Sequence, residues 1–102
     1  MSEKKEYNLN KLRKDINKID SKIIKLFSDR FFAAKKIARY KQTNNIPVKD
    51  KKREEQLINE IKKKAKKLDI DTNFSEKIFR ELIEESCRIQ KKINEDESIQ
   101  KD

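Results

Sequence analysis

Residues 9–41 read LNKLRKDINKIDSKIIKLFSDRFFAAKKIARYK and contain neither glycine nor proline. In the first half of this stretch apolar residues recur every three or four positions, the spacing of one face of an α-helix. They are Leu9, Leu12, Ile16, Ile19, Ile23 and Leu26. The same face then carries two cations, Arg30 and Lys41. The stretch therefore predicts one helix of more than 30 residues, whose inner face changes from apolar to cationic.

Neither cation on this face has a carboxylate close by on its own helix. Side chains three or four residues apart are neighbours on a helix, and no Asp or Glu occupies those positions around Arg30 or Lys41. A cation that is removed from water needs an opposite charge, and arginine does not lose its proton. The opposite charge is therefore expected elsewhere in the fold or on an anionic ligand.

The composition of the whole chain favours an all-α fold. The 102 residues include no glycine and one proline, and 46% are charged against 33% hydrophobic. Such a composition suits amphipathic helices better than a β-sheet. We expect one domain over residues 1–102, with residues 1–6 and 95–102 as frayed tails. So short a chain commonly gains buried surface by forming an oligomer.

The first predicted break separates the long helix from a second one. Residues 42–47 offer asparagine for a left-handed C-cap position and end at Pro47, which cannot continue a helix. A second helix is then predicted from about Asp50 to Lys67. Its inner face carries Leu57, Ile58, Ile61 and Ala65.

A second break, residues 68–73, precedes the third predicted helix. Either Asp71 or Asn73 can cap this helix, and Glu76 has the spacing of a capping-box partner for Asn73. The helix is predicted to end at about Asn94. Its apolar stripe consists of Ile78, Phe79, Leu82, Ile83, Ile89 and Ile93.

Polar residues interrupt the apolar faces of the second and third helices as well. Glu54 shares the inner face of the second helix, and Ser86 and Gln90 interrupt the stripe of the third. Each could be a satisfied hydrogen bond in the core, and Arg30 with Glu54 could be a structural ion pair. Taken together with Lys41, these residues indicate a polar cavity inside a small helical core.

Arg13 adds a constraint on the assembly. It lies 17 residues before Arg30, which is ~25 Å along one continuous helix, so the two cannot hold one small ligand within one chain. Arg30 and Lys41 are ~16 Å apart along the axis and nearly in line, so their long side chains can converge. An antiparallel copy of the long helix would bury its stripe and bring Arg13 of one subunit toward Arg30 of the other.

Several classes of protein are disfavoured by charge and composition. The net charge is 28 − 19 = +9, but the lysines alternate with acids along every helix without interleaved aromatics, so we do not expect nucleic acid as a partner. With no histidine and the single Cys87, neither a metal site nor an internal disulfide is expected. Residues 1–5 lack the apolar core of a signal peptide, and no apolar run is long enough for a membrane span. A cytoplasmic protein is therefore expected.

The sequence closely resembles the all-helical class of chorismate mutases between about Leu9 and Lys91. The similarity rests on Leu12-Arg13 with the long apolar stripe, on Arg30 and Lys41, on residues 46–54, IPVKDKKRE, and on residues 83–86, IEES, with Gln90. The Asp-x-x-Arg-Glu motif after Pro-Val is the most specific part. The resemblance implies an intertwined dimer of three-helix chains with two active sites, each completed by an arginine of the other subunit.

The resemblance also implies a role for each matched residue and the use of no cofactor. Arg13 of the partner chain and Arg30 would hold the carboxylates of chorismate, while Lys41 and Gln90 would donate to its ether oxygen. Glu54, with the backbone near Asp50, would bind the ring hydroxyl. Ser86 and Arg53 would help to place the ring carboxylate. Asp50 could instead act mainly as the N-cap of the second helix.

Two other functions stay open at this point. An isochorismate-pyruvate lyase shares the fold and the equivalents of Arg13, Arg30, Lys41 and Gln90, although the intact motif from Asp50 to Glu54 favours the mutase. A non-catalytic basic helical dimer that binds nucleic acid is the alternative from a different class.

Overall fold

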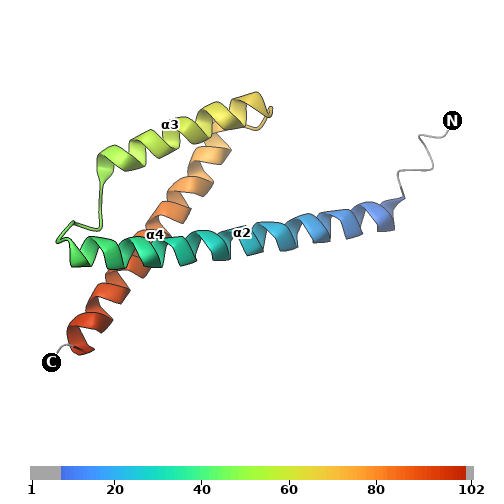
Figure 1. Ribbon diagram of the computed structural model, residues 1–102. Helices are drawn as coiled ribbons and strands as arrows, with labels where there is room; N and C mark the ends of the chain where they lie inside the picture. Colours follow the sequence, from blue (N-terminus) through green and yellow to red (C-terminus); the bar gives the residue numbers. More distant parts are fainter. Residues whose placement is uncertain (1–7, 101–102) are drawn as a thin grey trace. The chain divides into compact units, whose positions relative to one another are not determined.

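The computed structural model describes residues 8–100, with side chains through residue 96, and all regular structure in that range is helical (Figure 1). The three helices are α2 (Leu9–Thr43), α3 (Lys51–Lys67) and α4 (Thr72–Gln100). The predicted all-α, three-helix chain with a very long first helix is therefore confirmed. Residues 1–7 and 101–102 lie outside the described residues, and with them most of the predicted N-terminal tail and the end of the C-terminal one.

An asparagine lies just outside each end of the first helix. The Asn8 Oδ1 atom accepts hydrogen bonds from the backbone N–H of Asn10 at 2.9 Å and of Lys11 at 3.2 Å, as an N-cap residue does. At the other end Asn45 has a φ of 55°, a left-handed conformation that asparagine adopts more readily than most residues. The Ile46 N–H donates to the Lys41 carbonyl at 2.7 Å. The predicted left-handed asparagine is thus confirmed, two residues beyond the end of α2.

The described chain consists of two units. The first runs to Phe32, and residues 8–32 of it form the N-terminal part of α2. The second begins at Ala33 and contains the end of α2 together with α3 and α4, of which α3 packs against α4. Its buried apolar residues are Ala34, Ala38, Ile58, Ala65 and Leu82. The core of the second unit is therefore small, with alanine at three of five positions.

The N-terminal part of α2 leaves its apolar stripe in contact with solvent. The six stripe residues are between 38% and 64% exposed: Leu9, Leu12, Ile16, Ile19, Ile23 and Leu26. Arg30 and Lys41, on the same face, are each less exposed than any of them. A single chain therefore does not bury the stripe that its sequence pattern marks as an inner face.

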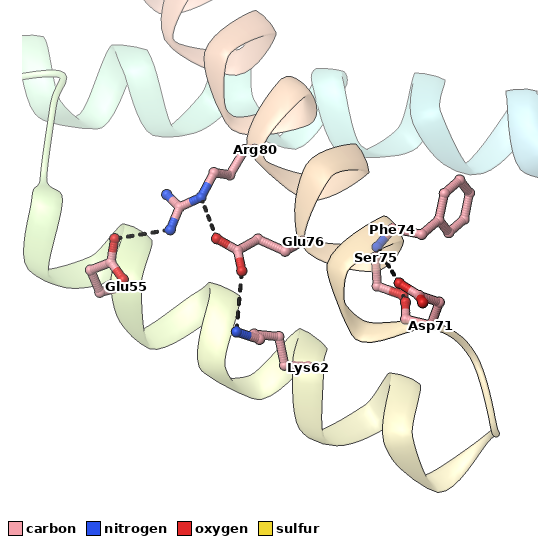
Figure 2. Close-up of polar contacts among 7 residues, drawn as sticks. All are labelled: Glu55, Lys62, Asp71, Phe74, Ser75, Glu76 and Arg80. Atoms are coloured by element: carbon pink, nitrogen blue, oxygen red, sulfur yellow. Dashed lines mark hydrogen bonds and ion pairs between the residues drawn. The ribbon is translucent and has the colours of Figure 1, made fainter.

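The start of α4 differs from the prediction based on a capping box. Asp71 is the N-cap, since its Oδ1 accepts from the Phe74 N–H at 2.8 Å and its carbonyl accepts from the Ser75 hydroxyl at 2.9 Å (Figure 2). Asn73 therefore lies inside the first turn, and the predicted pairing of Asn73 with Glu76 is wrong. Glu76 instead binds the side chains of Arg80 and Lys62.

The end of α4 was also predicted wrongly. The helix continues to Gln100, six residues past Asn94, so residues 95–100 are helical. No glycine or proline occurs there to stop the helix. Glu95 and Asp96, the first residues of this segment, are exposed, and exposed polar residues are compatible with a helix.

Candidate active site

The two arginines of the candidate site lie in the first unit. Arg13 is exposed, whereas Arg30 is partly buried and its desolvation lowers the pKa of the guanidinium. Arginine nevertheless stays protonated at neutral pH. Both residues belong to one continuous helix, so the separation of ~25 Å along its axis holds. The structure does not bring Arg13 and Arg30 of one chain together.

Lys41 makes hydrogen bonds to the connection between α2 and α3. It is partly buried, and its Nζ donates a hydrogen bond to the Val48 carbonyl at 2.8 Å. Its own carbonyl accepts from the Ile46 N–H. Lys41 thus holds the connection at two points, through its backbone and through its ammonium group. The Val48 carbonyl was not among the predicted contacts, since no sequence pattern signals a backbone acceptor.

The motif that follows Pro47 has a local structural explanation. Asp50 is the N-cap of α3: its Oδ1 accepts from the Arg53 N–H at 3.0 Å, and its carbonyl accepts from the Glu54 N–H at 3.0 Å. Asp50 and Arg53 are exposed, whereas Glu54 is partly buried in the first turn of α3, where a carboxylate interacts favourably with the helix dipole. The alternative role of Asp50 as an N-cap is therefore confirmed.

We expect Asp50→Ala and Asp50→Asn to separate capping from charge. Asparagine caps as well as aspartate does, whereas alanine leaves the Arg53 N–H without an acceptor, which costs about 1 kcal/mol in the free energy of unfolding. Denaturant unfolding of the three proteins measures this difference. If Asp50→Asn unfolds as easily as Asp50→Ala, the carboxylate charge is the stabilising feature and the cap is not.

Ser86 and Gln90 lie on consecutive turns of α4 and are both buried, at 7% and 6% exposure. The Gln90 Oε1 atom has no hydrogen-bond partner among the described residues. Buried polar groups in native proteins nearly always have a partner, and leaving one without a partner is costly. A donor from water, from a ligand or from a second chain is therefore expected beside the Gln90 Oε1 atom.

Six of the eight predicted site residues belong to the second unit, and the structure places these six in two groups. Lys41, Asp50, Arg53 and Glu54 surround the α2–α3 connection and the first turn of α3. Ser86 and Gln90 lie on α4, the helix against which α3 packs. An open surface hollow elsewhere on α4 contains none of the eight predicted residues; it is lined by Arg88, Lys91, Lys92, Glu95 and Asp96.

An ion-pair network between α3 and α4 was missed by the sequence reasoning (Figure 2). Arg80 binds Glu76 through Nε at 2.8 Å and Glu55 through Nη2 at 3.2 Å, and Lys62 binds Glu76 at 3.2 Å. The hydrogen bonds from Arg80 and Lys62 lower the pKa of the Glu76 carboxyl, and those to Glu76 and Glu55 raise the pKa of Arg80. The four-residue spacing of Glu76 and Arg80 could have indicated one pair, but nothing in the sequence links Arg80 to Glu55.

The described residues offer no cluster of three or more His, Cys, Asp or Glu side chains that could hold a metal ion. Within the same part of the chain, every helix is too short or too polar to cross a lipid bilayer.

The chain is similar to known proteins over most of its length. The sequence profile of the family described as chorismate mutase type II matches residues 12–91, a range that encloses all eight predicted site residues. The chain is 39% identical over 88 residues to the chorismate mutase of Methanocaldococcus jannaschii, which covers 86% of this chain and 89% of that protein.

Two further relatives are bifunctional chorismate mutase/prephenate dehydratases. The chain is 37% identical over 81 residues to that of Buchnera aphidicola subsp. Schizaphis graminum and 32% identical over 88 residues to that of Aquifex aeolicus. The matches cover 79% and 83% of this chain but 21% and 24% of those proteins. The chain thus spans less than a quarter of either bifunctional relative.

Proposed function

The chain belongs to the chorismate mutase type II family, and we propose on this premise that it converts chorismate to prephenate. The observation that carries the proposal is the family match over residues 12–91, which contains every candidate residue from Arg13 to Gln90. The prephenate dehydratase activity in the names of two relatives is not part of the proposal.

The proposed reaction is a concerted rearrangement within one molecule. The ether carbon–oxygen bond of chorismate breaks while a carbon–carbon bond forms between the side chain and the ring, so no atom enters or leaves. The reaction requires no nucleophile, metal or cofactor. The enzyme must fold the flexible side chain over the ring and stabilise the negative charge that develops on the ether oxygen. Positioned hydrogen-bond donors can do both.

Cationic and amide donors supply this stabilisation. In the proposed site Arg30 and the partner subunit's Arg13 bind the two carboxylates, because the planar guanidinium matches a carboxylate with two parallel hydrogen bonds. Lys41 and Gln90 donate to the ether oxygen. The burial of Gln90 and the half-buried ammonium of Lys41 support this assignment, since such donors act more strongly away from bulk water.

The remaining residues hold the ring of chorismate. Glu54, together with the backbone near Asp50, binds the ring hydroxyl, and Ser86 and Arg53 help to place the ring carboxylate. The N-cap geometry supports a role of Asp50 through its backbone N–H, because its side chain and its carbonyl already accept from the N–H groups of Arg53 and Glu54.

The active unit in this proposal is an intertwined dimer. The exposed apolar stripe of α2 supports it, because its six residues are the kind of continuous apolar surface that a partner covers. A closed dimer with two-fold symmetry gives two equivalent sites. Each site then takes Arg13 from one chain and the other seven residues from its partner.

Addition of purified protein to chorismate is expected to remove the absorbance of chorismate with formation of prephenate. The same measurement with isochorismate should show no turnover. Release of pyruvate from isochorismate would indicate the lyase instead. Retention on DNA or RNA that weakens with salt, without any effect on chorismate, would indicate the basic binding protein.

A further inference from the structure

The packing of α3 on α4 relies on few buried side chains. On α3 these are Ile58, which is 2% exposed, and Ala65. Apolar contact is not directional, and a small contact of this kind restrains the sliding and rotation of one helix on another only weakly. Hydrogen bonds between charged groups have a narrow range of distance and angle. Directional contacts between α3 and α4 therefore add a restraint on their relative position.

The ion-pair network of Glu55, Arg80, Glu76 and Lys62 supplies such contacts (Figure 2). Its residues on α3 lie seven positions apart, about two turns, on either side of Ile58. Its residues on α4 are four positions apart and are joined to each other. Two separate bonds across the helix pair, from Arg80 to Glu55 and from Lys62 to Glu76, resist both sliding and rotation of α3.

The network ends next to the proposed site. Glu55 directly follows Glu54 and is two residues from Arg53, in the turn that Asp50 caps. On α4 Arg80 precedes Ser86 by six residues, ~9 Å along the axis. A shift of α3 on α4 therefore changes the distance between Glu54 and the Ser86–Gln90 pair.

We propose that Arg80 and Glu55 are positioning residues, which hold Glu54 and Arg53 at the correct distance from Ser86 and Gln90 for chorismate to bind. This inference rests on the proposed function. The network residues are partly or largely exposed, with side-chain exposures from 27% to 61%, and exposed ion pairs contribute little to stability. Their geometry matters more, because small misplacements of binding groups have large effects on rate.

The test compares Glu55→Gln and Arg80→Gln with the parent in steady-state turnover of chorismate. Each variant is expected to lose about tenfold in kcat/KM, mainly through a higher KM, while the thermal midpoint stays within about 2 °C. Unfolding of a fraction of the enzyme would lower the apparent kcat and leave KM unchanged, so the rise in KM identifies a positioning role. The double variant should be no worse than either single variant, since both remove the same contact.

Arg88→Gln is the matched control. Arg88 is also on α4 and is ion-paired, but its partner Glu85 is three residues away on the same helix. Its kcat/KM should equal that of the parent. Arg80→Lys should recover part of the loss, because an ammonium group keeps the charge but cannot reach both carboxylates with a planar fork. High salt should reduce the difference between the parent and Glu55→Gln.

Three results would overturn the inference. They are parental KM values in Glu55→Gln and Arg80→Gln, an equal loss in Arg88→Gln, or additive losses in the double variant. Each of them leaves the proposed function intact as long as the parent converts chorismate. Absence of turnover by the parent would instead overturn the proposed function, and the inference with it.

Discussion

Refolding a mixture of Arg13→Ala and Arg30→Ala chains is expected to restore about a quarter of the parental turnover of chorismate, although neither variant is active alone. Random pairing makes half of the dimers mixed, and each mixed dimer has one intact site out of two. That site takes Arg30 from one chain and Arg13 from the other. Each single variant should lose about 10²- to 10³-fold in kcat, the typical effect of removing one positioned hydrogen-bond donor from an active site.

A mixture of Arg30→Ala with Lys41→Ala chains is the matched control. In the proposed dimer both residues of a site come from the same chain, so every mixed dimer has one site without Arg30 and one without Lys41. No activity should return. If the Arg13 and Arg30 variants also fail to complement each other under conditions that refold the parent, Arg13 is not shared between subunits.

Gln90→Glu is expected to remain active in acid and to lose activity as the pH rises through neutrality, whereas the parent keeps its activity. An amide donates a hydrogen bond at any ordinary pH, but a carboxyl group donates only when it is protonated. Burial at this position, where Gln90 is 6% exposed, raises the pKa of a carboxyl group because it disfavours the charged form. Activity is therefore present below that pKa and disappears above it.

The measurement is kcat/KM for both proteins across the pH range, with unfolding followed at each pH. The unfolding data are needed because a charged glutamate at a buried position also destabilises the fold as the pH rises. Activity that falls while the protein stays folded supports a hydrogen bond to the ether oxygen. Identical pH profiles of the two proteins would remove Gln90 from that role.

The helices were predictable because their signals are local. The three- and four-residue periodicity located α2 to within two residues of Leu9–Thr43, and Asp50 marked the start of α3 correctly. The errors occurred where two local signals compete. Asp71 and Asn73 can both cap a helix, and Glu76 pairs with Arg80 on its own helix and with Lys62 on α3 instead of with Asn73. After Asn94 the sequence becomes polar but contains no glycine or proline. The change to polar residues wrongly predicted the end of the helix there.

The candidate site was predictable only as a set of residues. Ser86 and Gln90 can be recognised in the sequence as polar residues on an apolar stripe, and both are buried in the structure. Their arrangement was not predictable, because contacts such as Lys41 with Val48 and Arg80 with Glu55 depend on how separate helices and loops pack. Whether Arg13 completes the site from a second chain stays a prediction.

The hydrogen bond from Lys41 to the Val48 carbonyl affects how readily the ammonium group could bind a substrate oxygen. An ammonium group in water must shed its hydration shell before it can bind an anionic oxygen. The ammonium of Lys41 is already partly withdrawn from water and oriented by a backbone acceptor. In the proposed site, binding of chorismate would add an oxygen to a lysine whose orientation is already set, so little reorganisation energy remains to be supplied during the reaction.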